Sequence, residues 1–144
     1  MAFLSSLDIA GSALTAQRFR TDIILQNLSN AETTKTKNGD PYRRKQVVFE
    51  ERTLDFKEIL NQQSSPANAG GVRVKTVEES ENDFVPVYDP SHPHANEEGY
   101  VMMPNVNRTE EQIDLMAASN AYNANLTALS LVKAMTMKAL EIGK

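Results

Sequence analysis

Apolar residues recur with helical spacing at both ends of the chain. The first end segment runs from about Phe3 to Ala31 and contains a mostly apolar stripe. Its members follow one another at intervals of three, four or seven residues: Phe3, Leu7, Ala10, Leu14, Thr21, Leu25 and Leu28. Such spacing predicts an amphipathic helix, roughly 40 Å long at about 1.5 Å per residue. A smaller apolar patch lies on its other side, at Ile9, Phe19 and Ile23.

The other end segment, from about Glu110 to Ile142, predicts a longer helix. A T-x-x-Q pattern at Thr109 and Gln112 predicts a capping box at its start. A first apolar stripe is formed by Leu115, Tyr122, Leu126, Leu129 and Leu140. What we call the second stripe is formed by Ala117, Ala121, Ala124, Ala128, Leu131, Met135 and Ile142. Together the two stripes are wider than the roughly 100° arc that one partner buries.

The second stripe can therefore be covered in two ways. It can be buried inside a small helical bundle, although this chain supplies only two long helices. We favour the alternative, in which the second stripe meets another subunit, because an extended exposed apolar surface marks an interaction site.

The middle of the chain predicts strands and turns, and it holds all six prolines. A turn signal stands at residues 38–41, and a loop of small residues at Pro66–Gly71. Three runs predict strands: Gln46–Phe49, Val72–Val77 and Phe84–Tyr88. The last is expected at a sheet edge, because Pro86 has no backbone donor.

These patterns together predict an elongated α+β fold. The terminal helices should pair as a coiled-coil-like unit, with a small β-rich and loop-rich segment between them. We expect a first helical part at 1–34, a middle part at 35–106 and a second helical part at 107–144.

Composition removes several classes of function. The chain of 144 residues has no cysteine, which excludes disulfides and thiolate catalysis. Its net charge of −4 argues against nucleic acid as a partner. Charged residues at 18, 20 and 22 interrupt the first apolar segment, so we expect no membrane span there. The first residues lack the basic and apolar regions of a secretory signal, so we expect none.

Charge is segregated within the middle part. Residues 35–45 carry five basic side chains and one acidic one, whereas residues 78–98 carry seven acidic side chains and no basic one. Two solvated surfaces would explain this distribution. Electrostatic complementarity between neighbouring copies would explain it as well.

One cluster resembles a metal or catalytic site. It contains Asp89, His92 and His94, followed by Glu97 and Glu98. Two histidines and a carboxylate can bind zinc or iron, but prolines at 90 and 93 suit a rigid structural turn. Gly70-Gly71 lacks the lysine of a phosphate loop. We therefore predict no catalytic, cofactor-binding or metal-binding residue.

Several motifs resemble one protein family, the bacterial flagellar axial proteins. The N-terminal motifs of that group are matched by Asp8-Ile-Ala-Gly-Ser-Ala-Leu14 and by Asn27-Leu-Ser-Asn30-Ala31. The proximal rod members of the family are matched by Pro41–Phe49, Tyr88–Pro93 and Gly99–Asn107. Matches to the C-terminal helix lie at Ala118–Asn125 and Lys138–Ile142. The resemblance covers nearly the whole chain in the expected order.

The resemblance implies a non-enzymatic structural subunit of the flagellar rod, the drive shaft that crosses the periplasm. It implies partners among other copies of the chain, other rod and basal-body proteins, and the type III export apparatus, which would pass the chain without a cleaved signal. With the apolar stripes, it predicts an assembly interface that includes Leu7, Leu14, Leu25, Asn27, Leu28, Asn30, Ala117, Ala121, Tyr122, Ala124, Ala128, Leu131 and Met135.

Two other classes of function compete with a rod subunit. A soluble helical adaptor or export chaperone would bury the second stripe against a client, but it has little use for a proline-rich β segment. A metal-dependent hydrolase would rest on His92 and His94 alone. The role of the acidic segment 78–98 stays open.

Overall fold

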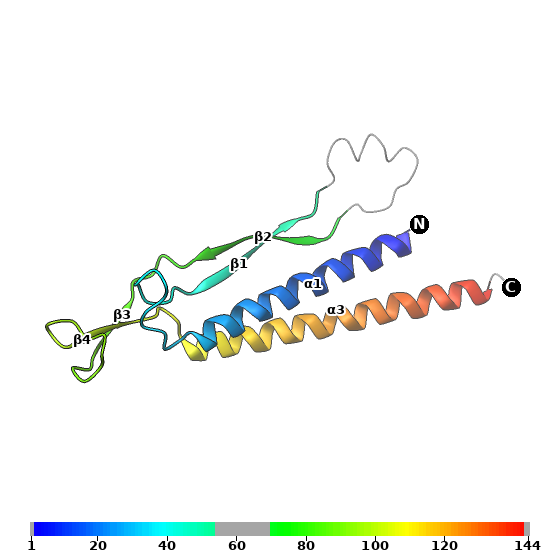
Figure 1. Cartoon of the computed structure of the whole chain (residues 1–144). Helices are drawn as coiled ribbons and strands as arrows, with labels where there is room; N and C mark the ends of the chain where they lie inside the picture. Colours follow the sequence, from blue (N-terminus) through cyan, green and yellow to red (C-terminus); the bar gives the residue numbers. More distant parts are fainter. Residues whose placement is uncertain (1, 54–69, 143–144) are drawn as a thin grey trace.

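The computed structural model describes residues 2–53 and 70–142 as two long helices and four strands. In chain order these are α1 (Ala2–Ser29), β1 (Lys45–Glu51), β2 (Val72–Glu79), β3 (Val85–Tyr88), β4 (Tyr100–Met103) and α3 (Arg108–Ile142). The helices pack side by side and antiparallel, and the strands lie along α1 and beyond one end of the pair (Figure 1). This is the elongated α+β fold that the sequence predicts.

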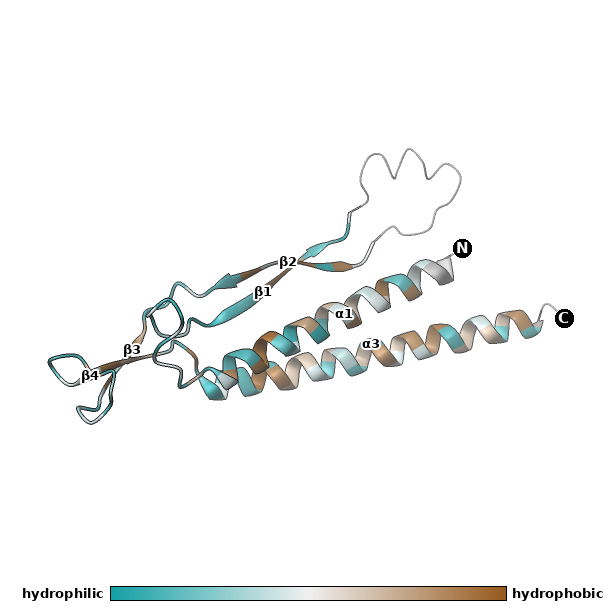
Figure 2. Cartoon of the chain, in the orientation of Figure 1, coloured by the Kyte–Doolittle hydropathy of each residue, from teal (hydrophilic) through white to brown (hydrophobic). Residues whose placement is uncertain are grey.

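Small and apolar side chains form the contact between α1 and α3. Ala10 and Ile24 of α1 and Ala118 of α3 are buried there, and small residues let two helices approach closely. Further along α3, the half-buried positions continue at intervals of three and four: Ala121, Asn125, Leu129, Val132 and Thr136. Hydrophobic residues occur along the whole length of α3 (Figure 2). More of α3 is therefore apolar than the contact with α1 uses.

Two details of the predicted helices are wrong. Asn107, not Thr109, caps α3, because its side-chain oxygen accepts from the backbone N–H of Thr109 at 3.0 Å. Leu126 and Leu140 of the first stripe are exposed, as is Leu25 of α1. The buried face of α3 is centred on Ala118 and Asn125, so these leucines fall beside the contact rather than within it.

The strands form two separate antiparallel pairs. β1 pairs with β2 from Lys45 opposite Glu79 to Glu51 opposite Val72, with an irregularity after Val48. This hairpin lies against α1 (Figure 1). β3 pairs with β4 in a ribbon of two strands, so Pro86 lies at an edge as predicted.

The sequence prediction of strands is confirmed for β1, β2 and β3, but it omitted β4. The short run that forms β4 has no alternation of polar and apolar residues, and therefore gave no signal of its own. At the predicted turn of residues 38–41, Gly39 has a φ of 96°. The predicted loop Pro66–Gly71 lies outside the described residues except at its two glycines.

Candidate assembly interface

A cluster of polar side chains joins α1, β1 and α3 at the end of the helix pair nearest the strands. We call this cluster the polar junction, and it consists of Arg20, Asn27, Tyr42, Arg44, Glu111 and Asp114. Asn27 and Glu111 are each only 1% exposed, which is unusual for side chains of these types. Buried polar groups of this kind are stable only when they are hydrogen-bonded.

Asn27 uses its whole hydrogen-bonding capacity within the chain. Its amide nitrogen donates to the Lys45 carbonyl at 2.9 Å and to the Glu111 carboxylate at 3.0 Å. Its oxygen accepts from the Tyr42 hydroxyl at 2.9 Å and from the Lys45 backbone N–H at 3.0 Å. An asparagine side chain has two donors and two acceptor positions, and all four are occupied here. Asn27 thereby ties α1 to both β1 and α3.

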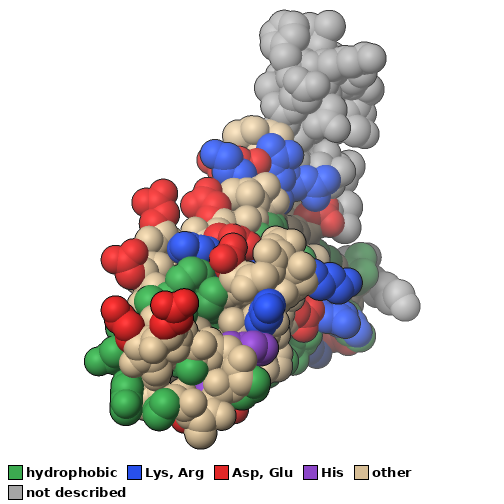
Figure 3. Space-filling view, turned by 60° about the vertical axis from the view of Figure 1, so that its left-hand side comes forward, with side chains coloured by type: hydrophobic (Ala, Val, Ile, Leu, Met, Phe, Trp, Pro, Cys, Tyr) green, Lys and Arg blue, Asp and Glu red, His purple; other side chains and the backbone are tan. Residues whose placement is uncertain are grey.

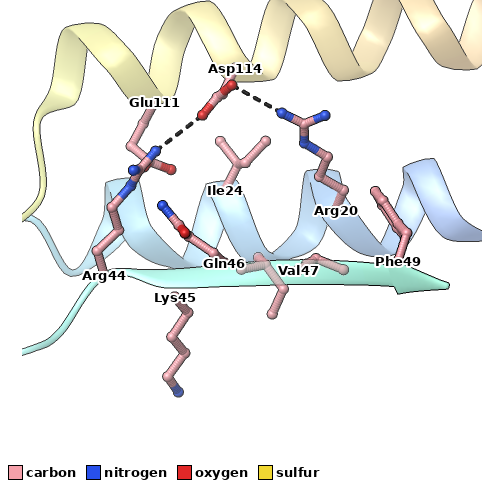
Figure 4. Close-up of a pocket in the computed structure, with 10 residues that line it drawn as sticks. Arg20, Ile24, Arg44, Lys45, Gln46, Val47, Phe49, Glu111 and Asp114 are labelled. Atoms are coloured by element: carbon pink, nitrogen blue, oxygen red, sulfur yellow. Dashed lines mark hydrogen bonds and ion pairs between the residues drawn. The ribbon is translucent and has the colours of Figure 1, made fainter. Parts of the chain in front are cut away.

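Arg44 connects the start of β1 to the first turns of α3. Its guanidinium donates to Glu111 at 2.5 Å and to Asp114 at 3.1 Å, and it lies 3.3 Å from the Glu110 carboxylate. Arg20 of α1 reaches the other oxygen of Asp114 at 3.0 Å, so that carboxylate bridges two elements (Figure 4). Burial lowers the pKa of Arg44, but the hydrogen bond and charge of Glu111 outweigh it and raise the pKa.

Tyr42 is held in its neutral form by the same surroundings. Burial, followed by the negative charges of Glu111 and Glu79, raises its pKa to about 12.

A cavity of about 280 Å³ adjoins the junction between α1, β1 and α3. Two arginines and two carboxylates on its wall pair with one another, whereas Lys45 points away from it (Figure 4). The polar junction therefore has a structural role: its paired charges hold α1, the start of β1 and α3 together.

The residues predicted for the assembly interface fall into two groups in the structure. On α1, the side chains of Leu7, Leu14 and Leu28 are half-buried against the rest of the chain, and Leu25 is exposed. Asn27 belongs to the polar junction. Asn30 closes the end of α1 locally, because its amide donates to the Gln26 carbonyl at 2.8 Å.

The second stripe of α3 is mostly exposed in the single chain. Ala121 is half-buried, whereas the other positions of the stripe whose side chains are described are exposed: Ala117, Ala124, Ala128, Leu131 and Met135. Tyr122, from the first stripe, is 36% exposed.

Sequence analysis missed two exposed apolar residues near the start of α3. Ile113 is 63% and Met116 68% exposed, whereas Leu131 at 61% and Met135 at 55% belong to the predicted second stripe. The signal that could have found Met116 is the lack of charge around it, because α3 carries no charged residue between Asp114 and Lys133. A long helix that faced water over that span would normally carry charged residues there.

The histidine cluster forms a turn that is held by hydrogen bonds within it and by one contact to the segment after α1. The Asp89 carboxylate accepts from the backbone and hydroxyl of Ser91 at 3.1 and 2.6 Å, which lowers its pKa. His94 contacts the Thr34 hydroxyl at 2.9 Å through Nδ1. Within residues 2–53 and 70–142, no three histidine or carboxylate side chains are grouped so that they could hold a metal ion. Across the same residues, no helix has the length and apolar character needed to span a membrane.

Known relatives share the full length of the chain. It is 49% identical over 150 aligned positions to the flagellar basal-body rod protein FlgC of Bacillus subtilis, with both chains covered completely. It is 43% identical over 145 positions to that of Salmonella typhimurium, again with complete coverage. The corresponding Borreliella burgdorferi protein is 38% identical over 149 positions, which cover 99% of this chain and 98% of the relative. No family model matches the chain.

Proposed function

The chain belongs to the family of flagellar basal-body rod proteins FlgC, and we propose that it assembles by packing the exposed second stripe of α3 against neighbouring subunits. As a member of this family it is a structural subunit of the flagellar basal-body rod.

The observation that supports this proposal is the uncharged, exposed face of α3. Ile113, Leu131 and Met135 are each more than half exposed, and the alanines between them leave room for close approach of another helix. Burying such side chains contributes about 1–2 kcal/mol each when roughly half of their surface is still exposed. Several of them along one helix would stabilise an assembly by several kcal/mol per subunit.

We propose that the partners at this face are other copies of the chain and other rod and basal-body proteins. The chain would reach them by type III export in an unfolded form, and the assembled rod would cross the periplasm. No catalytic role is proposed. The polar junction supports this proposal. It fixes the β1–β2 hairpin to the helix pair, and the outer face of α3 stays exposed for contacts with other subunits.

Labelling the protein in isolated basal bodies tests the proposal. An epitope placed after the last residue should be seen by electron microscopy in the rod, and it should be absent from cells whose type III export apparatus is inactive. A protein that stays in the cytoplasm of exporting cells, bound to an unassembled client, would contradict the proposal and favour an adaptor or chaperone.

A further inference from the structure

The β3–β4 ribbon carries an exposed apolar patch on one face. Directly paired residues of antiparallel strands share a face, so the pairs Pro86 with Met102 and Tyr88 with Tyr100 lie together. We call these four residues the ribbon patch. Tyr88 is 66% exposed and Met102 48%. An exposed apolar cluster of this kind, on a ribbon that lies beyond the end of the helices, indicates an interaction site.

The patch is held in a fixed shape. The rings of Tyr88 and Tyr100 pack edge to face, with centroids 5.3 Å apart. Gly99 is buried beneath Tyr88 with a φ of 81°, and a Cβ at that position would lie 2.9 Å from the tyrosine ring. Only glycine combines this backbone conformation with such a close contact. A patch that is already ordered loses little conformational entropy when it binds.

Acidic side chains predominate on the turns that adjoin the ribbon patch, and Lys35 lines a pocket together with Tyr100 and Met102. The exposed carboxylates on the adjoining turns are those of Glu81, Asp83, Glu97 and Glu98. Among the ion pairs of the described residues, none involves any of these four. Hydrophobic and acidic side chains lie next to one another at this end of the molecule (Figure 3). The partner should therefore have an apolar centre and a basic rim.

The chain itself carries a surface of that description. A groove of about 400 Å³ between α1 and β2, which we call the α1–β2 groove, is lined by Ser12, Thr15, Ala16, Phe19, Arg52, Val72, Arg73 and Val74. The surface that lines the groove is mainly apolar, because Phe19, Val72 and Val74 contribute to it. Its charged members are both arginines, and Lys75 of β2 is exposed beside them. Arg73 pairs with Glu50 at 2.6 Å, whereas Arg52 and Lys75 form no ion pair with another residue that the structure describes.

We propose that the ribbon patch of one copy docks in the α1–β2 groove of a second copy. The proposal rests on the proposed function, because it supplies a lateral contact between rod subunits. The ribbon lies beyond one end of the helix pair, whereas the groove lies along the flank of α1 (Figure 1). Since the two surfaces differ, the contact is head-to-tail and continues from copy to copy in a ring or helical array.

The small area of the ribbon patch limits the affinity of this contact. A stable pair of proteins buries about 800 Å² on each partner, and four side chains cannot supply that area alone. The contact therefore acts together with the second stripe of α3 and is formed within the assembly rather than in dilute solution. The experiment must accordingly use assembled basal bodies.

Disulfide cross-linking tests the proposal, and the chain has no cysteine of its own to interfere. The variant Met102→Cys with Val72→Cys places one thiol in the ribbon patch and one in the groove, both at exposed positions where folding should be retained. Mild oxidation of isolated basal bodies should give covalent dimers and higher multimers of the chain. Each single-cysteine variant should give at least fivefold less product.

The other outcomes each overturn the inference. Strong dimerisation of the Met102→Cys single variant would mean that ribbons pair with ribbons. Cross-links to a different rod protein would mean that the occupant is not a second copy, and no cross-link in basal bodies that contain the protein would mean that the surfaces do not meet. Absence of the protein from basal bodies would instead refute the proposed function, and this inference with it.

Charge reversal provides a matched check. Glu97→Lys with Glu98→Lys, added to the double-cysteine variant, should lower the cross-link yield at least threefold, because the basic rim would then be repelled. Arg52→Glu should restore much of that yield. An unchanged yield after reversal at both ribbon positions would overturn the electrostatic part of the proposal.

Discussion

The side-chain amide of Asn27 donates to the carboxylate of Glu111 at 3.0 Å, and the two residues lie 84 positions apart on different helices. Because both side chains are buried, this bond and its neighbours fix the register of α1 against α3. The Tyr42 hydroxyl and the Arg44 guanidinium add the start of β1 to the same cluster. The polar junction thus determines where the helices and the hairpin meet, and with it which face of α3 stays outside.

Replacing Asn27 tests the junction directly. Asn27→Ala should lower the free energy of unfolding by about 3 kcal/mol, because it leaves buried groups of Tyr42, Lys45 and Glu111 without partners. Chemical denaturation of the purified chain measures this. Asn30→Ala is the control and should cost less than about 1 kcal/mol, since its side-chain hydrogen bonds are local and stay within residues 26–33. Equal costs for the two variants would contradict the assigned role.

Arg44 should matter far more than an exposed arginine. Arg44→Met leaves the carboxylate of Glu111 buried without its cation, which typically costs about 3–5 kcal/mol. Arg73→Met breaks an exposed pair with Glu50 and should cost less than about 1 kcal/mol. In denaturant titrations, adding Glu111→Met to Arg44→Met should recover much of the loss, because the unpaired charge is then removed. Failure of this recovery would show that Arg44 acts mainly through packing.

High pH should weaken the fold through Tyr42. Its pKa is about 12 in the folded chain and near 10 when unfolded, so the folded state holds the proton more tightly. This contribution is fully present below about pH 10 and is lost as the pH rises towards about 12. Unfolding titrations across that range should show a fall in stability that Tyr42→Phe reduces. A variant with the same pH dependence as the parent chain would exclude Tyr42 as the cause.

Protection from hydrogen exchange should be uneven along the helices of the free subunit. We expect slow exchange around residues 24–27 and 111–118, where the buried side chains lie. Exchange should be faster in residues 126–141 of α3, where most side chains are exposed. Helices gain most of their stability from packing rather than from propensity. Uniformly strong protection over the whole of α3 in a dilute monomer would contradict this expectation.

Sequence patterns identified both helices and three of the four described strands, but not the contacts between these elements. The stripes identified both helices, because their apolar residues recur every three or four positions, and alternation identified β2. The polar junction could not be found in this way. Glu111 lies seven residues before Ala118, on the buried face of α3, but a charged residue there has no periodic signal. Its partner Arg44 lies on a different element, and only the fold brings them together.

The second stripe shows where prediction from sequence was informative. Two stripes on α3 indicated more apolar surface than one partner can bury, and the described positions of the second stripe are mostly exposed in the single chain. Which subunit covers them depends on surfaces outside this chain. For that reason the assembly interface at Ala117, Ala124 and Leu131 stays a prediction.

Incorporation of an Ala124→Leu variant into the rod tests the central claim most directly. Ala124 is exposed in the single chain, so this change should alter the free energy of unfolding by no more than about 0.5 kcal/mol. In an assembled interface, the larger side chain should cost about 1–3 kcal/mol at every copy. Isolated basal bodies should therefore contain little of the Ala124→Leu protein and normal amounts of an Ala124→Ser control, at equal cellular levels. Equal incorporation of the two variants, with normal motility, would contradict the claim that this face of α3 meets neighbouring subunits.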